Sequence, residues 1–128
     1  MNPLTSEWVE KAEGDFATAA RELRVRKAPN YDAVCFHAQQ CAEKYLKAVL
    51  QEAGIPFPKT HNLAALLDMA KTVQPAWEML RPSLLDLATH SVNVRYPGET
   101  ADKPTARAAR DAARHVRSLV RAHLGLEP

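Results

Sequence analysis

Apolar residues recur at helical spacing along most of this 128-residue chain. The longest regular stretch runs from Tyr31 to about Ala53, where Asn30 can cap the amino end and Gly54 can end the helix. Its apolar side is wide enough to pack against at least two other helices. That side consists of Tyr31, Val34, Cys35, Ala38, Cys41, Ala42, Tyr45, Ala48 and Val49. The pattern therefore predicts a long, largely buried helix.

Four further segments show the same period. They cover residues 5–24, 62–72, 76–90 and 104–124. Thr5 or Ser6 is expected to cap the first of them, and Thr60 the second. Pro82 is expected to kink or divide the third, and Pro104 suits the first position of the last.

The chain shows no alternating strand pattern and no internal repeat, and residues 93–103 have the Pro, Gly and polar composition of a loop. These features predict an all-α protein. We expect an antiparallel up-and-down bundle of four to five helices, which forms a single domain over residues 1–128.

Composition narrows the class of protein further. Hydrophobic residues make up 46% and charged residues 25% of the chain, as in folded globular proteins. No apolar run is long enough to cross a bilayer, and the amino terminus lacks the order of a secretory signal. We therefore expect a cytoplasmic protein with no membrane partner.

Metal and disulfide chemistry have little support in the sequence. Cys35 and Cys41 lie six residues apart within one predicted helix, too far apart to bridge each other. The chain contains neither a CxxC pair nor an HExxH motif. The expectation is two small buried cysteines, no metal and no cofactor.

The last predicted helix carries a row of arginines, which we name the basic ridge. At about 100° per residue, their spacing of three, four, three and four residues places them on one side of the helix, opposite its apolar side. The members are Arg107, Arg110, Arg114, Arg117 and Arg121. The row is expected to point away from the core. Surface charge rows are most often simply solvated, and the alternative is a platform for phosphate groups or an acidic partner.

A second polar row follows one side of the long helix beside its apolar side: His37, Gln40, Lys44 and Lys47. Glu43 and Lys47 form an i,i+4 pair that can support the helix, and a histidine at such a boundary is more often structural than catalytic.

Two loop features are more specific. His61 follows Thr60 directly, and Arg95 and Tyr96 precede Pro97 in the long loop. A loop of this kind can hold a guanidinium rigidly enough to grip phosphate oxygens, and the alternative is a loop anchored by its tyrosine.

Three segments together resemble the HEPN domain, named for higher eukaryotes and prokaryotes nucleotide-binding. They are FHAQQCAEKYLKAVL (residues 36–50), THNL (60–63) and VRYPGE (94–99). The resemblance implies a helical bundle that commonly forms a homodimer or higher oligomer. It also implies a minimal nucleotidyltransferase as the partner in a toxin–antitoxin-like pair. The positions matching the family, expected to bind a nucleotide or RNA, are His37, Glu43, Lys47, His61, Arg95 and Tyr96. Of these, Lys47, His61, Arg95 and Tyr96 are expected to line one shared cleft.

A metal-independent endoribonuclease is the alternative, because many HEPN relatives cut RNA with an arginine followed four to six residues later by a histidine, paired across a dimer. Arg95 has no histidine in that window. Arg110 and His115 match the spacing, but five residues along a helix turn the two side chains apart by roughly 140°. A binding module without assigned catalytic residues is therefore the leading hypothesis. A dimeric nuclease built on Arg110 and His115, or on His61 or His37 shared with Arg95, is the alternative, and a purely assembling protein is a third.

Overall fold

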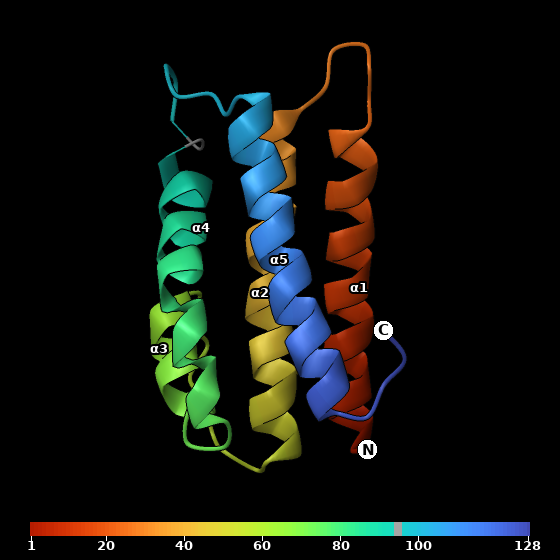
Figure 1. The fold of residues 1–128 in the computed structure, drawn as a ribbon, viewed down its shortest axis with the longest axis vertical. Helices are drawn as coiled ribbons and strands as arrows, with labels where there is room; N and C mark the ends of the chain where they lie inside the picture. The colour runs from red at the N-terminus through yellow and green to blue at the C-terminus, as the bar shows by residue number, and fades with distance from the viewer. Residues whose placement is uncertain (94–95) are drawn as a thin grey trace.

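The helix α2 (Tyr31–Glu52) lies at the centre of the bundle and contacts the other four α-helices. In this computed structural model, which describes residues 1–93 and 96–128, the described residues contain no strand. The remaining elements are α1 (Pro3–Leu23), α3 (Leu63–Ala70), the 3-10 helix η1 (Pro75–Leu80), α4 (Arg81–Asn93) and α5 (Lys103–His123). Figure 1 shows α1, α5 and α4 standing along the same axis, with α2 behind α5. The predicted all-α bundle is confirmed, and none of the described helices is long and apolar enough to cross a membrane.

The predicted limits of the long helix agree with α2. Asn30 caps it by accepting a hydrogen bond from the backbone N–H of Ala33 at 3.0 Å. Beyond its end, Gly54 has a φ of 70°, a left-handed conformation that glycine adopts at little cost. Thirteen residues of α2 are buried, which is why this helix forms the core.

Two other helix starts differ from the prediction. Asn2, not Thr5 or Ser6, caps α1 by accepting from the N–H of Leu4 at 2.8 Å, and Pro3 takes the first helical position. Likewise Asn62 caps α3 by accepting from the N–H of Ala65 at 3.0 Å. The cap of α1 thus lies before the predicted residues, and the cap of α3 lies two residues after Thr60. Because α1 starts early, Thr5 is buried inside it.

Prolines determine the remaining boundaries. The segment predicted around Pro82 is divided between η1 and α4, and Pro82 lies in the first turn of α4, where its missing N–H has no intrahelical role. Asp102 caps α5 by accepting from the N–H of Thr105 at 2.9 Å, so Pro104 takes the second helical position rather than the first.

Both cysteines lie in the core. Cys35 and Cys41 are fully buried and are not bonded to each other. Burial, together with the nearby Asp32 and Asp102 carboxylates, raises the pKa of the Cys35 thiol to about 11.

Candidate functional site

The polar row of α2 lies between α1 on one edge and the segment before α3 on the other. His37 and Lys44 contact α1, while Glu43 contacts His61. We name this surface the polar face of α2. It comprises Asp15, His37, Gln39, Gln40, Glu43, Lys44, Lys47 and His61.

At one end of the polar face, Asp15 of α1 holds two residues of α2. Its Oδ1 lies 2.8 Å from His37 Nδ1, and its Oδ2 accepts from Lys44 Nζ at 2.6 Å. A carboxylate only accepts hydrogen bonds, so the Nδ1 of His37 carries the proton. The other ring nitrogen, Nε2, is then the one that can contact a ligand.

Glu43 makes the equivalent arrangement further along α2. Its Oε1 lies 2.9 Å from His61 Nδ1, and its Oε2 accepts from Lys47 Nζ at 3.0 Å. The side chains of Glu43 and Lys47 are only 3% and 7% exposed, whereas that of His61 is 78% exposed. Glu43 and Lys47 therefore form a buried ion pair, and Glu43 also positions the exposed imidazole of His61. This is a further role besides the helix support expected from the i,i+4 spacing.

Two glutamines connect the residues of the polar face. Gln40 donates to the side-chain oxygen of Gln39 at 2.8 Å. Gln39 in turn donates to Glu43 at 3.3 Å and to the backbone carbonyl of His61 at 3.2 Å. These bonds tie the His61 backbone to α2. The position of this imidazole is therefore determined by both its side chain and its main chain.

Aromatic rings close the far end of the polar face. The ammonium of Lys47 lies 5.4 Å from the centroid of the Trp8 ring, within cation–π range. Trp8 itself packs against Phe57 with the ring centroids 6.2 Å apart. Lys47 is thus held by a carboxylate on one side and an indole on the other.

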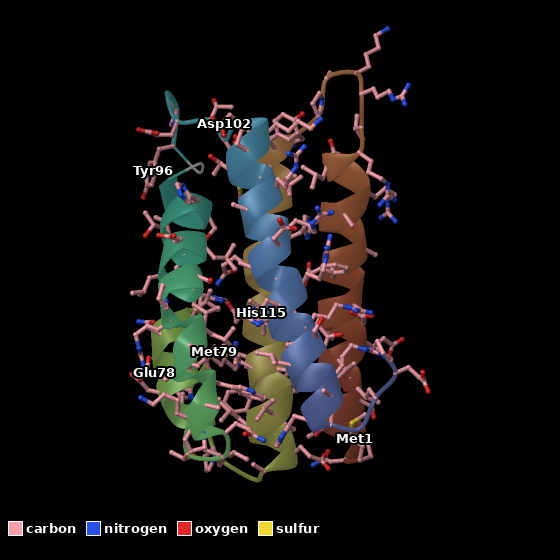
Figure 2. All side chains as sticks on the ribbon, in the orientation of Figure 1. Met1, Glu78, Met79, Tyr96, Asp102 and His115 are labelled. Atoms are coloured by element: carbon pink, nitrogen blue, oxygen red, sulfur yellow. The ribbon has the colours of Figure 1, made fainter. Side chains whose placement is uncertain are left out.

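Within one chain, Tyr96 lies far from Lys47, with which it is expected to share a cleft. Arg95 lies outside the described residues, and Figure 2 places Tyr96 at the same end of the bundle as Asp102. The N–H of Ala101 donates to Asp32 at 2.7 Å, which ties this loop to the first turn of α2. Lys47 lies fifteen residues further along α2, roughly 22 Å away at 1.5 Å per residue. Tyr96, 63% exposed, is therefore not a neighbour of Lys47.

The basic ridge divides into two parts, which corrects the expectation that it points away from the core throughout. Arg117 Nε and Nη2 each donate to a Glu13 oxygen at 2.7 Å, and its guanidinium lies 5.1 Å from the Phe16 ring centroid. Tyr45 donates to Glu13 at 2.6 Å, and Arg121 donates to the Tyr45 hydroxyl at 3.2 Å. We name these four residues, Glu13, Tyr45, Arg117 and Arg121, the Glu13 cluster.

Two of the other arginines of the ridge lie nearer the solvent. Arg107 and Arg114 are exposed, and Arg110 donates to its neighbour Asp111 at 2.8 Å. Arg117 lies between helices because α5 packs against α1, and Glu13 of α1 faces the guanidinium. Arg107 and Arg114 are therefore the arginines of the ridge that offer charge to a partner, because the side chain of Arg110 is only 19% exposed.

In the Glu13 cluster, burial and hydrogen bonding have opposite effects on the pKa of Glu13. Burial alone would raise the pKa of Glu13, but hydrogen bonds from Arg117 and Tyr45 hold it below its ordinary value of 4.5. Burial and the bond to Glu13 raise the pKa of Tyr45. The cluster is therefore an ionised carboxylate saturated by strong donors, which is typical of a structural role.

A groove of about 610 Å³ runs between α4 and α5. Its polar lining residues are Ser83, Asp86, His90, Thr105, Asp111 and His115. His115 lines this groove (Figure 2 labels it midway along α5), whereas Arg110 does not. The two residues of the ribonuclease-like spacing therefore point to different surfaces of α5. Within residues 1–93 and 96–128, no three His, Cys, Asp or Glu side chains are arranged to hold a metal ion.

Comparison with known proteins agrees with this architecture. The helical bundle is similar to the crystal structure of an archaeal HEPN homologue, with a TM-score of 0.68 and 25% sequence identity over 93% of this chain and 96% of that one. The family model of the HEPN domain matches residues 5–123, and the chain belongs to the HEPN family. No curated protein matches the sequence.

Two residues of the polar face were not expected from the sequence. Asp15 does carry a signal, because it interrupts the buried side of the first helix between Ala12 and Ala19, and a carboxylate there needs partners. Gln39 carries no such signal, since glutamine is common on exposed helix positions. Its role follows only from the path of the chain around His61.

Proposed function

We propose that this HEPN protein is a binding module for a nucleotide or RNA, and that the polar face of α2 makes the contacts. One observation carries the proposal: two carboxylates hold two imidazoles by Nδ1 on the side of one helix, with Lys44 beside the first. Both imidazoles reach the surface, so each can offer Nε2 to a ligand.

These groups suit the polar parts of a nucleotide. An imidazole Nε2 can accept a hydrogen bond from a ribose hydroxyl, and after protonation it can donate to a phosphate oxygen. An ammonium such as that of Lys44 attracts phosphate as a point charge. Because Lys44 shares its charge with Asp15, the expected affinity is modest and falls with salt.

Family membership supports a homo-oligomer, since HEPN domains commonly dimerise. We propose a cytoplasmic homodimer or higher oligomer, which pairs with a minimal nucleotidyltransferase as in a toxin–antitoxin system. The exposed arginines Arg107 and Arg114 offer positive charge to an acidic partner. Light scattering at several concentrations tests the oligomer, and copurification with the protein of the adjacent coding region tests the pairing.

The binding surface is tested by titrating a labelled oligoribonucleotide and labelled AMP at about 50 and 200 mM salt. We expect Lys44→Ala to weaken binding about fivefold to tenfold, the loss of one charge-assisted hydrogen bond. Arg107→Ala is the matched control, because it removes an exposed cation from the basic ridge. Normal binding by Lys44→Ala with a loss in Arg107→Ala would transfer the function to the ridge. Arg95→Ala is also predicted from the sequence to weaken binding.

A ribonuclease is the second candidate, because His90 and His115 line one groove. The imidazole of His115 can act there as general base or general acid on a ribose 2′-hydroxyl and its phosphate. Incubating the protein with RNA in excess chelator tests this activity. Cutting that disappears in His115→Ala supports it, and intact RNA dismisses it.

A further inference from the structure

A hollow of about 300 Å³ lies between the first turns of α1 and the last turn of α2. It is lined by Leu4, Glu7, Trp8, Lys11 and Gln51. None of these side chains belongs to the polar face of α2 or to the groove between α4 and α5. The hollow is therefore a separate feature of the surface that needs its own explanation.

The hollow continues the polar face along α2. Gln51 follows Lys44 by seven residues and Lys47 by four, a spacing that places all three on one side of the helix. Trp8 lines the hollow and also contacts the ammonium of Lys47. Seven residues span about 10 Å of helix, so a molecule the size of a nucleotide can reach from the hollow toward Lys44.

The lining has the chemistry that a nucleobase requires. Trp8 supplies an aromatic surface, and base–aromatic contact is a general source of affinity that every base can use. The amide of Gln51 can donate and accept, and the carboxylate of Glu7 accepts from ring or exocyclic N–H groups. Lys11 adds a positive charge at the rim. An apolar ligand would leave these polar groups unpaired, which disfavours a lipid or an apolar side chain.

We propose that this hollow is the base subsite of the nucleotide or RNA that the polar face of α2 binds. The base lies against the indole of Trp8 with its polar edge toward Gln51 and Glu7, and its phosphate extends toward Lys44. This inference rests on the proposed function, and it names the part of the ligand that the imidazoles and the lysine do not recognise.

Trp8 provides a direct signal for the test. The chain has two tryptophans, and Trp77 is buried against the His123 ring, so Trp77→Phe leaves Trp8 as the single indole. The variant is titrated with AMP, GMP, UMP, ribose 5-phosphate and a short oligoribonucleotide, while calorimetry measures binding independently. We expect nucleotides to quench Trp8 fluorescence and ribose 5-phosphate, which has no base, to leave it unchanged.

Substitutions separate the subsite from general packing. Trp8→Ala is expected to weaken nucleotide binding about tenfold. Because Trp8 also packs on Phe57, Glu7→Ala and Gln51→Ala provide a milder test, with an expected loss of about threefold each. Glu10→Ala is the matched control, since it removes an exposed carboxylate of the same helix that does not line the hollow.

The outcomes distinguish the two proposals. Suppose calorimetry detects nucleotide binding, but Trp8 fluorescence does not change and Glu7→Ala and Gln51→Ala bind with unchanged affinity. That result overturns the base subsite and leaves the proposed function standing. Equal affinity for ribose 5-phosphate and AMP also overturns it. A Trp8 response to the oligoribonucleotide alone supports the subsite, with RNA as the source of the base. No binding of any nucleotide or of RNA overturns the proposed function together with the subsite.

Discussion

Glu13 and Asp15 lie two residues apart on α1, and they organise two opposite regions of the molecule. Two residues turn a helix by about 200°, so the two carboxylates leave α1 on different sides. Glu13 receives Arg117 and Tyr45 on the side facing α5. Asp15 receives His37 and Lys44 on the polar face of α2.

The partners determine what each region can do. A guanidinium keeps its charge at any physiological pH, and the donors around Glu13 are used up within the Glu13 cluster. An imidazole held by one nitrogen can still offer the other to a ligand. All three carboxylates therefore hold cations or donors, but Asp15 and Glu43 each also position an imidazole at the surface, whereas Glu13 does not.

The largest effect on stability is expected from breaking the buried Glu43–Lys47 ion pair on the polar face. Glu43→Gln leaves the Lys47 ammonium buried without a charged partner, which should lower the free energy of unfolding by about 3 kcal/mol. Urea unfolding monitored by circular dichroism measures it. An unchanged midpoint would show that Lys47 reaches water and that the pair does not support the fold.

Arg117→Ala should have the next largest effect, about 2 kcal/mol of unfolding free energy, because it removes a bidentate partner of Glu13 and the contact with Phe16. The matched control is Arg107→Ala, an exposed arginine of the same helix, for which we expect a change within about 0.5 kcal/mol. Equal losses in both variants would contradict the division of the basic ridge into two parts.

Glu13→Gln should show a pH-dependent effect. The pKa of Glu13 is held below its ordinary value of 4.5, so the stability it contributes is present at neutral pH and is lost as the pH falls below that value. We expect the variant to be less stable than the wild type by about 1 kcal/mol at pH 7. Thermal unfolding from pH 7 to pH 3 should show the two proteins converging. A difference that stays constant across this range would argue against an ionised Glu13.

The smallest effect on stability is expected for His61→Ala. Its side chain is mostly exposed, and Glu43 keeps Lys47 as a partner, so unfolding should change by no more than about 0.5 kcal/mol. Nucleotide affinity should nevertheless fall about fivefold through the loss of one hydrogen bond. If His61→Ala lowered stability but left nucleotide affinity unchanged, the imidazole of His61 would support the fold and would not bind the ligand.

Local signals in the sequence predicted much of the fold. The limits of α2 follow from Asn30, Gly54 and an apolar period, all of which act over a few residues. The sequence predicts the start of α1 at Thr5 or Ser6 because several residues there can cap a helix, and only the packed structure selects Asn2. Which of several possible capping residues starts a helix depends on which first turn can pack against the core.

The site was less predictable, because its contacts join distant parts of the chain. His37, Glu43, Lys47 and His61 were expected from the family resemblance, but the sequence does not show that Asp15 and Glu43 each bind an imidazole. The spacing of the basic ridge likewise predicts one helix side, while the position of α1 beside α5 determines which arginines meet Glu13.

The burial of both cysteines has a practical consequence for measuring distances in this protein. At neutral pH the Cys35 and Cys41 thiols are protonated and shielded from solvent, so they should react slowly with maleimides and spin labels. A single cysteine introduced at an exposed position, such as Glu10 or Arg107, could then be labelled selectively in the otherwise native chain. Distances between such labels would report directly on how two copies of the bundle meet.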